Sequence, residues 1–248
     1  MTRMESKATT DSKRSDDWSF FEAVYCISLS ERSDRRREAH RQFAAVGLAD
    51  RVEFVNVTRH PTNNEQGIWE SHLACIAKGL AAGAEHVLIF EDDIVFDDFS
   101  RAAWQSAVSF FNVHEHCRLL FLGCLVTGSR RTGNPNVLSV DYRSLAHAYA
   151  IKRSLAVELV DEKWRQVPFD AMLAGLAEEK FAVYPAFAFQ SNAASDNANH
   201  RGLEKFRRLC GGLKFIQKMN ETFHRHKTAI IALHLLVIAA VLWLAWHW

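Results

Sequence analysis

Three consecutive carboxylates, Glu91, Asp92 and Asp93, directly follow an apolar stretch at residues 87–90. The stretch is typical of a strand buried on both faces, and ligands of open α/β sheets bind at the carboxyl ends of the strands. Carboxylate oxygens are the ligands that Mg²⁺ and Mn²⁺ prefer. Because side chains alternate along a strand, we expect Glu91 and Asp93 to share one face and bind such a cation, while Asp92 orients a neighbouring group. The alternative is an acidic turn at the surface.

The charge of the chain is unevenly distributed. Its 248 residues, 48% of them hydrophobic, are enough for one large domain and an appendage. The net charge is +1, but residues 201–227 contain eight Lys or Arg and two Glu, a local charge of +6, so the rest of the chain carries −5. An acidic body with a basic segment argues against a nucleic-acid-binding core. The five cysteines form no CxxC pair, and Cys26 and Cys75 lie in apolar segments, which predicts reduced core residues.

The segments around the acidic stretch alternate between strand and helix patterns. Ser33 or Asp34 is a suitable N-cap for the first helix, and Gly47 a suitable C-terminal residue. This alternation predicts an α/β fold in which helices cover both faces of a mostly parallel sheet. We expect strands at residues 23–29, 52–57, 87–90 and 118–122, and helices at residues 33–47, 67–83 and 99–112.

The second half of the body has weaker patterns. Residues 127–136 contain Gly128, Gly133 and Pro135 and are typical of a mobile loop. Pro168 is expected near the start of a short helix. The remaining expected elements are strands at residues 146–151 and 181–185 and a helix at residues 154–164.

Several motifs follow one another in a particular order along the chain. They consist of Tyr25, Ile27, Leu29, Arg32, Asp34 and Arg35, then Gly67, Ser71 and His72, then Phe90, Glu91, Asp92 and Asp93, then Ala148, Tyr149, Ala150 and Ile151, then Pro168, Phe169 and Asp170. In this order and spacing they resemble glycosyltransferase family 25, the bacterial lipopolysaccharide galactosyltransferases that are related to collagen galactosyltransferases. The resemblance runs from about residue 23 to about residue 197 and implies a GT-A fold, a nucleotide-sugar donor and inversion at the anomeric carbon. The chain departs from the family at Ser28, where asparagine is usual, and in its hydrophobic end.

Sugar transfer from a nucleoside diphosphate breaks a bond to a pyrophosphate oxygen, where a divalent cation stabilises the developing charge. We expect Glu91 and Asp93 to bind Mn²⁺ or Mg²⁺ for this purpose, and the resemblance keeps Asp92 in the donor site. Arg32 and Arg35, between the first strand and the first helix, suit the diphosphate or the ribose of the donor. The alternative for the arginines is a solvated basic helix face.

Four further residues are candidates. The resemblance places Ser71 and His72 near the donor, although a lone helical histidine is also a common structural residue. Asp170 is the candidate general base, because an inverting transfer needs one carboxylate to take the proton of the acceptor hydroxyl; its position also fits an N-cap. His200 is a candidate third metal ligand by analogy with the GT-A fold alone.

Residues 228–248 carry no formal charge. At about 1.5 Å per residue, a helix of this length spans roughly 31 Å, the thickness of a bilayer core. Trp243, Trp246 and Trp248 cluster at one end as interfacial aromatic residues do, and basic residues at the other end would keep the body in the cytoplasm. The preceding residues 201–227 mix apolar and basic side chains and are expected to lie on an anionic leaflet. A buried core helix or helix-pairing segment is the alternative.

We therefore expect a disordered tail (1–17), a GT-A-like domain (18–200), a basic amphipathic segment (201–227) and a single-pass anchor (228–248) in the inner membrane. The predicted function is the metal-dependent, inverting transfer of a hexose, with galactose as the first candidate, from a UDP-sugar to a lipid-linked saccharide such as lipopolysaccharide core. Nucleic acid is not an expected partner. Two alternatives remain open: an inactive, tail-anchored scaffold on a degenerate GT-A fold, and a nucleotidyltransferase on a similar sheet.

Overall fold

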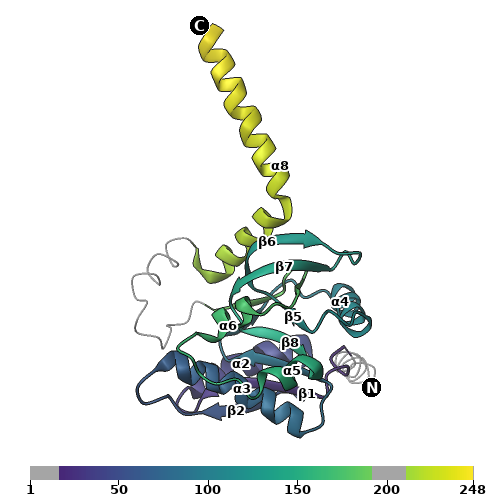
Figure 1. The fold of residues 1–248 in the computed structure, drawn as a ribbon, viewed down its shortest axis with the longest axis vertical. Helices are drawn as coiled ribbons and strands as arrows, with labels where there is room; N and C mark the ends of the chain where they lie inside the picture. The colour runs from purple at the N-terminus through teal and green to yellow at the C-terminus, as the bar shows by residue number, and fades with distance from the viewer. Residues whose placement is uncertain (1–16, 192–210, 248) are drawn as a thin grey trace, which may run out of the picture.

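The structure is a computed structural model that describes residues 17–191 and 211–247 (Figure 1). A body of strands and helices carries a long C-terminal helix that projects away from it. Apart from Asp17, the expected disordered tail lies outside the described residues, and so does His200.

An eight-stranded sheet with the order β2-β1-β3-β8-β5-β9-β7-β6 forms the centre of the body. Three neighbouring pairs, β1 with β2, β1 with β3 and β5 with β9, are parallel, and the other four are antiparallel. The sheet is therefore mixed, and the expectation of a mostly parallel sheet is wrong. Its strands are β1 (Ala23–Leu29), β2 (Glu53–Val57), β3 (His86–Glu91), β5 (Leu119–Phe121), β6 (Leu125–Arg131), β7 (Val137–Ser144), β8 (Ala148–Lys152) and β9 (Lys180–Val183).

One antiparallel pair in the second half of the sheet, β6 with β7, follows directly in the chain without a helical crossover. Parallel strands need a long connection, whereas antiparallel strands can be joined by a short turn. Strands β6 and β7 form such a hairpin, and β6 occupies the first part of the expected mobile loop, so that expectation is wrong. Gly128 lies at a bulge of this hairpin, where a Cβ would clash with Oδ2 of Asp141. The glycine thus marks a bulge and a close approach within a strand.

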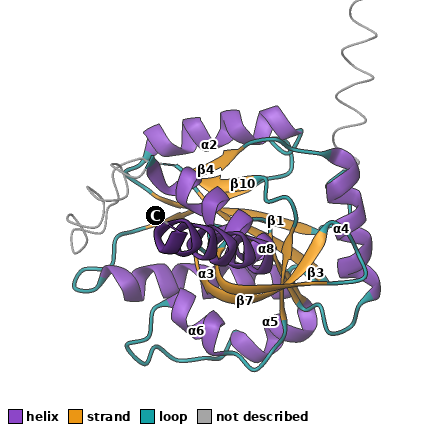
Figure 2. Cartoon of the chain, turned by 90° about the horizontal axis from the view of Figure 1, so that it is seen from above, coloured by secondary structure: helices purple, strands orange, loops and turns teal. Residues whose placement is uncertain are grey.

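Helices cover both faces of the sheet, as predicted. Figure 2 shows α2 and α4 on one face and α3, α5 and α6 on the other. Leu88 and Phe90 of β3 point into the core under α2 and α4, and Val87 and Ile89 point into the opposite core. All four are fully buried, which confirms that β3 is an interior strand. The helices are α2 (Ser33–Val46), α3 (Asn64–Ala81), α4 (Arg101–Val113), α5 (Arg153–Leu159) and α6 (Phe169–Gly175).

Helix α3 begins earlier than predicted. Oδ1 of Asn63 accepts hydrogen bonds from the backbone N–H groups of Glu65 and Gln66, which makes Asn63 the N-cap. Gly67 therefore lies inside the helix, packed so closely on His60 that a Cβ would lie 2.8 Å from the Cβ of His60. The early start moves Ser71 and His72 from the early part of the helix to its middle.

A second, two-stranded sheet connects the acidic stretch to the C-terminal helix. Its antiparallel strands are β4 (Ile94–Phe96) and β10 (Ala188–Gln190). Beside it runs α8 (Gly212–His247), in which Nε2 of the buried Gln217 donates a hydrogen bond of 2.9 Å to the carbonyl of Ala188. The first part of α8 is therefore packed on the body.

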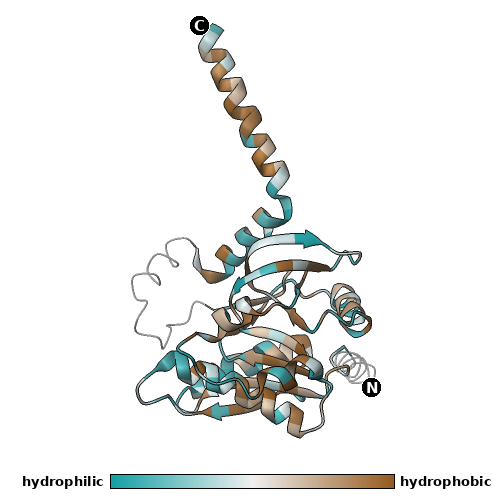
Figure 3. Ribbon diagram, viewed as in Figure 1, coloured by the Kyte–Doolittle hydropathy of each residue, from teal (hydrophilic) through white to brown (hydrophobic). Residues whose placement is uncertain are grey.

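Helix α8 bends at His226, whose φ of −117° and ψ of 17° are not helical. Beyond the bend it leaves the body, and Figure 3 shows that this part is almost entirely apolar. The most apolar 18-residue stretch of this helix has a mean hydropathy of 2.5, and none of it is buried in the body. The helix is thus long and apolar enough to cross a membrane, and the alternative of a buried core helix is wrong.

Candidate active site

The three carboxylates lie at the carboxyl end of β3. Glu91 is the last residue of the strand, whereas Asp92 and Asp93 form a turn that leads into β4. Because the strand ends at Glu91, the expected alternation does not extend over all three residues. Nη1 of Arg35 lies 3.2 Å from Oδ1 of Asp92 and 3.9 Å from Oδ2 of Asp93, while Glu91 contacts His72 of α3. The two aspartates, rather than Glu91 and Asp93, thus share a partner.

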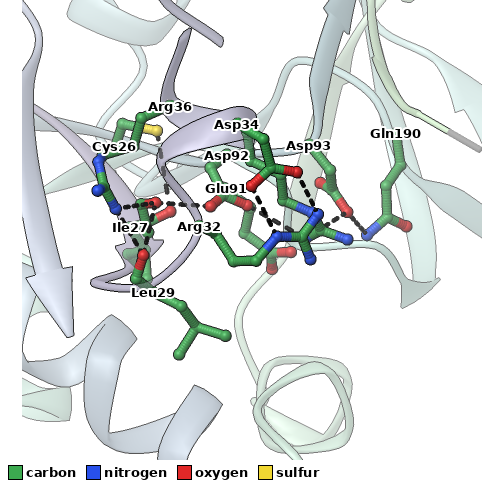
Figure 4. Close-up of polar contacts among 12 residues, drawn as sticks. Cys26, Ile27, Leu29, Arg32, Asp34, Arg36, Glu91, Asp92, Asp93 and Gln190 are labelled. Carbon is green, nitrogen blue, oxygen red and sulfur yellow. Dashed lines mark hydrogen bonds and ion pairs between the residues drawn. The ribbon is translucent and has the colours of Figure 1, made fainter. Parts of the chain in front are cut away.

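Asp92 is buried within a hydrogen-bond network. Its Oδ2 accepts a hydrogen bond of 2.7 Å from the hydroxyl of Ser28, the residue at which the chain departs from the family 25 pattern. Arg36 donates to the hydroxyl oxygen of Ser28 at 3.3 Å and to the carbonyl of Leu29 at 2.5 Å (Figure 4). This network joins the end of β1, the first turns of α2 and the acidic turn. Asp92 thus bonds to both Ser28 and Arg35.

Asp93 is partly buried, and one of its carboxylate oxygens is unsatisfied. Nε2 of Gln190 in β10 donates to Oδ2 of Asp93 at 2.9 Å (Figure 4). Its other oxygen, Oδ1, is buried and has no hydrogen-bond partner among the described residues. Burying a charged oxygen without a donor is unfavourable unless a proton or a cation occupies it. Asp93 is therefore the carboxylate best prepared for a cation.

Burial and mutual repulsion raise the pKa values of two of the carboxyl groups. The pKa of Glu91 rises to about 8 because of burial and the nearby charges of Asp170 and Asp92, against the opposing effect of Arg35. The pKa of Asp93 rises to about 7, mainly because of burial and the charge of Glu91. A divalent cation between the groups would remove this repulsion, so the two carboxylates fit the hard ion expected from the sequence.

The described residues supply only part of a coordination shell. Within residues 17–191 and 211–247, no group of three or more His, Cys, Asp or Glu side chains is placed to hold a metal. Mg²⁺ sites in nucleotide-dependent enzymes commonly use one or two carboxylates and take the remaining ligands from substrate phosphates and water. Glu91 and Asp93 fit such a shared site better than a closed protein cage.

His72 is a fully buried neighbour of Glu91. Its Nε2 lies 3.3 Å from Oε1 of Glu91, and its Nδ1 lies 3.1 Å from the hydroxyl of Tyr149. Its ring stacks on Phe169 with a centroid distance of 4.1 Å and an interplanar angle of 4°. Burial lowers the pKa of His72 to about 4. The imidazole is therefore neutral at pH 7, and its contact with Oε1 fixes the side chain of Glu91.

Ser71 and Arg32 form local contacts. The hydroxyl of Ser71 donates to the carbonyl of Gly67 at 2.6 Å, within its own helix. The guanidinium of Arg32 donates two hydrogen bonds of 2.9 Å to Asp34 (Figure 4). The structure thus brings Arg35, His72 and the acidic stretch together, while Ser71 and Arg32 are engaged with their own helices.

Asp170 is held by three hydrogen bonds. Its Oδ1 accepts from the hydroxyl of Tyr142 at 2.6 Å and from the N–H of Ala146 at 3.0 Å, and its Oδ2 accepts from the N–H of Leu145 at 3.0 Å. It lies in the first turn of α6, whose N-cap is Pro168, so the N-cap alternative is wrong. Leu145 has a φ of 77°, an unusual conformation that these bonds stabilise. The adjacent Phe169 stacks on His72, the partner of Glu91, and the charge of Asp170 helps to raise the pKa of Glu91.

Three residues of the site had at most a weak signal in the sequence. Ser28 stands inside an apolar strand, which is a weak sign of a buried polar contact, and Gln190 follows the expected last strand. Tyr142 lies on β7, a strand that the sequence did not predict. Their roles depend on contacts with residues far along the chain, which a local pattern does not contain.

Comparisons with known proteins give distant structural similarities. The chain is similar to the crystal structure of A197 from STIV (14% identity, TM-score 0.42, covering 68% of this chain and 85% of that chain). It is also similar to a mannose-1-phosphate geranyltransferase from Thermus thermophilus (12%, 0.40, covering 65% and 72%). A third similar structure is a glycosyltransferase involved in the glycosylation of the major capsid of PBCV-1 (6%, 0.35, covering 55% and 63%). No family model and no curated protein matches the chain, so the resemblance to family 25 stays a prediction.

Proposed function

We propose that this protein is a metal-dependent, inverting glycosyltransferase that uses a UDP-sugar. The observation that carries the proposal is the buried, unsatisfied Oδ1 of Asp93, which lies beside the protonatable carboxyl group of Glu91 and within reach of Arg35. Such a site favours a cation that brings anionic oxygens of its own, as a diphosphate does.

Each residue has a distinct role in the proposed reaction. Asp93 and Glu91 hold Mn²⁺ or Mg²⁺, which when bound supplies Lewis-acid stabilisation of the leaving diphosphate. Arg35 offers further positive charge to the donor, and Asp92 with Ser28 keeps its guanidinium in place. Neutral His72 fixes Glu91. These residues bind and orient the donor before any bond is broken.

Asp170 is proposed as the general base. A carboxylate has about four acceptor positions, and Tyr142, Ala146 and Leu145 occupy three of them. One position on Oδ2 is left to accept the proton of the acceptor hydroxyl as that oxygen attacks the anomeric carbon. The three hydrogen bonds fix the direction of the Asp170 side chain.

The proposed acceptor is a lipid-linked saccharide, such as lipopolysaccharide core, and the proposed sugar is galactose. The exposed apolar part of α8 supports this choice, because it can hold the domain at the inner membrane, where such acceptors are available. Basic residues before the apolar part support a cytoplasmic position of the domain under the positive-inside rule. Membership of glycosyltransferase family 25 belongs to the same proposal.

The test is Mn²⁺-dependent release of UDP from UDP-sugars by the full chain in detergent. Asp93→Asn should lower the rate by at least about a hundredfold, as expected when a charge-stabilising group of an active site is lost. Asp161→Asn, at an exposed aspartate, is the matched control; Asp97 is unsuitable because it binds two lysines of α8. Release of pyrophosphate would instead identify a nucleotidyltransferase. If neither UDP nor Mn²⁺ binds in calorimetry, the protein is a scaffold and the proposal fails.

A further inference from the structure

The first part of α8 is fastened to the body by several polar contacts. The side chain of Asn220 pairs with the backbone of Val126 in β6, donating to its carbonyl at 3.0 Å and accepting from its N–H at 2.9 Å. Glu221 accepts from the N–H of Ala186 at 3.0 Å, and the guanidinium of Arg225 lies over the ring of Tyr184 at 5.1 Å. The direction in which α8 leaves the body is therefore determined by the fold.

The apolar part of α8 leaves the body next to β6. Strand β6 is the outermost strand of the large sheet, and Figure 1 shows it beneath the point where α8 projects. Asn220, six residues before the bend of α8, is hydrogen-bonded to the backbone of Val126 in β6. The edge of the sheet and the exit of the apolar helix thus belong to one surface.

This surface is basic. Arg130 and Arg131 end β6 and are exposed, and Arg225 and Lys227 flank the bend of α8. The acidic side chain on the hairpin is Asp141, which lies 3.2 Å from Arg130. Because β6 is an edge strand, arginines on both of its faces can extend past the edge. Long cationic side chains beside an apolar helix match the anionic headgroups of a phospholipid leaflet in charge and in reach.

We infer that the β6–β7 hairpin is a second membrane contact, in which Arg130 and Arg131 bind anionic phospholipid headgroups beside the emerging α8. The inference rests on the proposed anchoring of α8 in a membrane. Two contacts fix the domain against rotation about the helix axis, whereas one helix does not. The body then keeps one side towards the bilayer. Strand β10 connects α8 to the acidic stretch, because its Ala188 bonds to Gln217 of α8 and its Gln190 bonds to Asp93.

The test uses the full chain in nanodiscs of phosphatidylcholine alone or of an equal mixture with phosphatidylserine, with a quencher on the headgroups. A fluorophore is attached at Gly133→Cys, where a Cβ meets nothing within 4 Å, or at Arg41→Cys on α2 as a distant control. A Cys210→Ser background is used, because Cys26, Cys75, Cys117 and Cys124 are buried. We expect quenching at position 133 in the mixed discs only, reversal by salt, and little quenching at position 41.

The double substitution Arg130→Gln and Arg131→Gln should weaken contact of the hairpin with the mixed discs. The ratio of quenched to unquenched fluorophore at position 133 should fall by roughly an order of magnitude. The matched control is Lys163→Gln with Arg165→Gln, which removes the same charge elsewhere on the surface. Equal quenching in both lipids, or no effect of the hairpin substitutions and of salt, would overturn the inference while leaving the anchor intact. A chain that does not enter nanodiscs at all would overturn the anchor, and with it the inference, whereas release of UDP is measured separately in detergent.

Discussion

The imidazole of His72 and the carboxyl group of Glu91 meet at 3.3 Å as two neutral groups. Burial lowers the pKa of His72 to about 4, and burial with nearby carboxylates raises that of Glu91 to about 8. At pH 7 the contact is therefore a hydrogen bond and not an ion pair. Replacing His72 by Phe preserves the stack on Phe169 but removes the bonds to Glu91 and Tyr149.

His72→Phe should lower the rate of UDP release strongly while lowering the stability of the protein only modestly. A net loss of about 1–2 kcal/mol in the free energy of unfolding is expected from two hydrogen bonds, because the aromatic packing remains. Because Glu91 is then no longer held by His72, Mn²⁺ should bind more weakly. Calorimetric titration with Mn²⁺ and thermal melting measure the two effects; unchanged Mn²⁺ affinity would exclude a positioning role for His72.

The stability of the metal-free protein should fall as the pH rises towards 8. Folded Glu91, with a pKa of about 8, keeps a proton that the unfolded group loses near 4.5, so its stabilising contribution is complete below 4.5 and is lost as the pH passes 8. Asp93 acts in the same direction up to about pH 7. The lowered pKa values of His72 and His147 act oppositely, but only between about 4 and 6.5.

The window from pH 7 to 8 therefore isolates Glu91. The free energy of unfolding, measured by denaturant titration with a chelator present, should decline there in the natural chain and less in Glu91→Gln. Asp161→Asn is again the control, since it is exposed. Parallel curves for the natural chain and Glu91→Gln would show that Glu91 is already ionised without a metal.

Mn²⁺ affinity should rise with pH, because the cation displaces protons from Glu91 and Asp93. Each displaced proton contributes up to about tenfold in affinity per pH unit below the pKa of its group. Calorimetry at pH 6 and pH 8, in buffers with different ionisation enthalpies, counts the protons that are released. An affinity that is independent of pH over this range would place the cation away from these carboxylates.

Asp170 can be tested separately from the turn that it holds. Tyr142→Phe removes one hydrogen bond from Oδ1 of Asp170 and should lower stability by about 1 kcal/mol while most activity remains. Asp170→Asn removes the base and disturbs the bonds to Leu145 and Ala146, so both activity and stability should fall. If Asp170→Asn retains the activity of Tyr142→Phe, Asp170 is a structural residue.

The docking of α8 should depend on Asn220. Replacing it by Leu leaves the N–H and the carbonyl of Val126 without their partner and should weaken docking by about 1–3 kcal/mol. Hydrogen exchange of residues 212–225 should increase. Thr222→Ala, on the exposed side of the same helix, is the control. Unchanged exchange in Asn220→Leu would show that the other contacts of α8 suffice.

Much of the fold followed from local patterns. The apolar stretch before Glu91 predicted a fully buried strand, and helical periodicity predicted helices on both faces, because burial and side-chain direction depend on neighbouring residues. The hairpin of β6 and β7 was missed because Gly128, a residue type that usually marks a loop, here marks a bulge. Which strands are parallel was also missed, since pairing joins residues far apart in the chain.

The amino-acid sequence by itself determined that a triplet of carboxylates ends an interior strand and that an uncharged helix of membrane-spanning length follows a basic segment. Only the tertiary structure decided which partner each carboxylate has: Ser28 and Arg35 for Asp92, Gln190 for Asp93, and His72 for Glu91. The reason is physical. Strand character and apolarity are local properties, whereas a pKa and a hydrogen bond depend on groups that folding brings from distant positions to within a few ångströms.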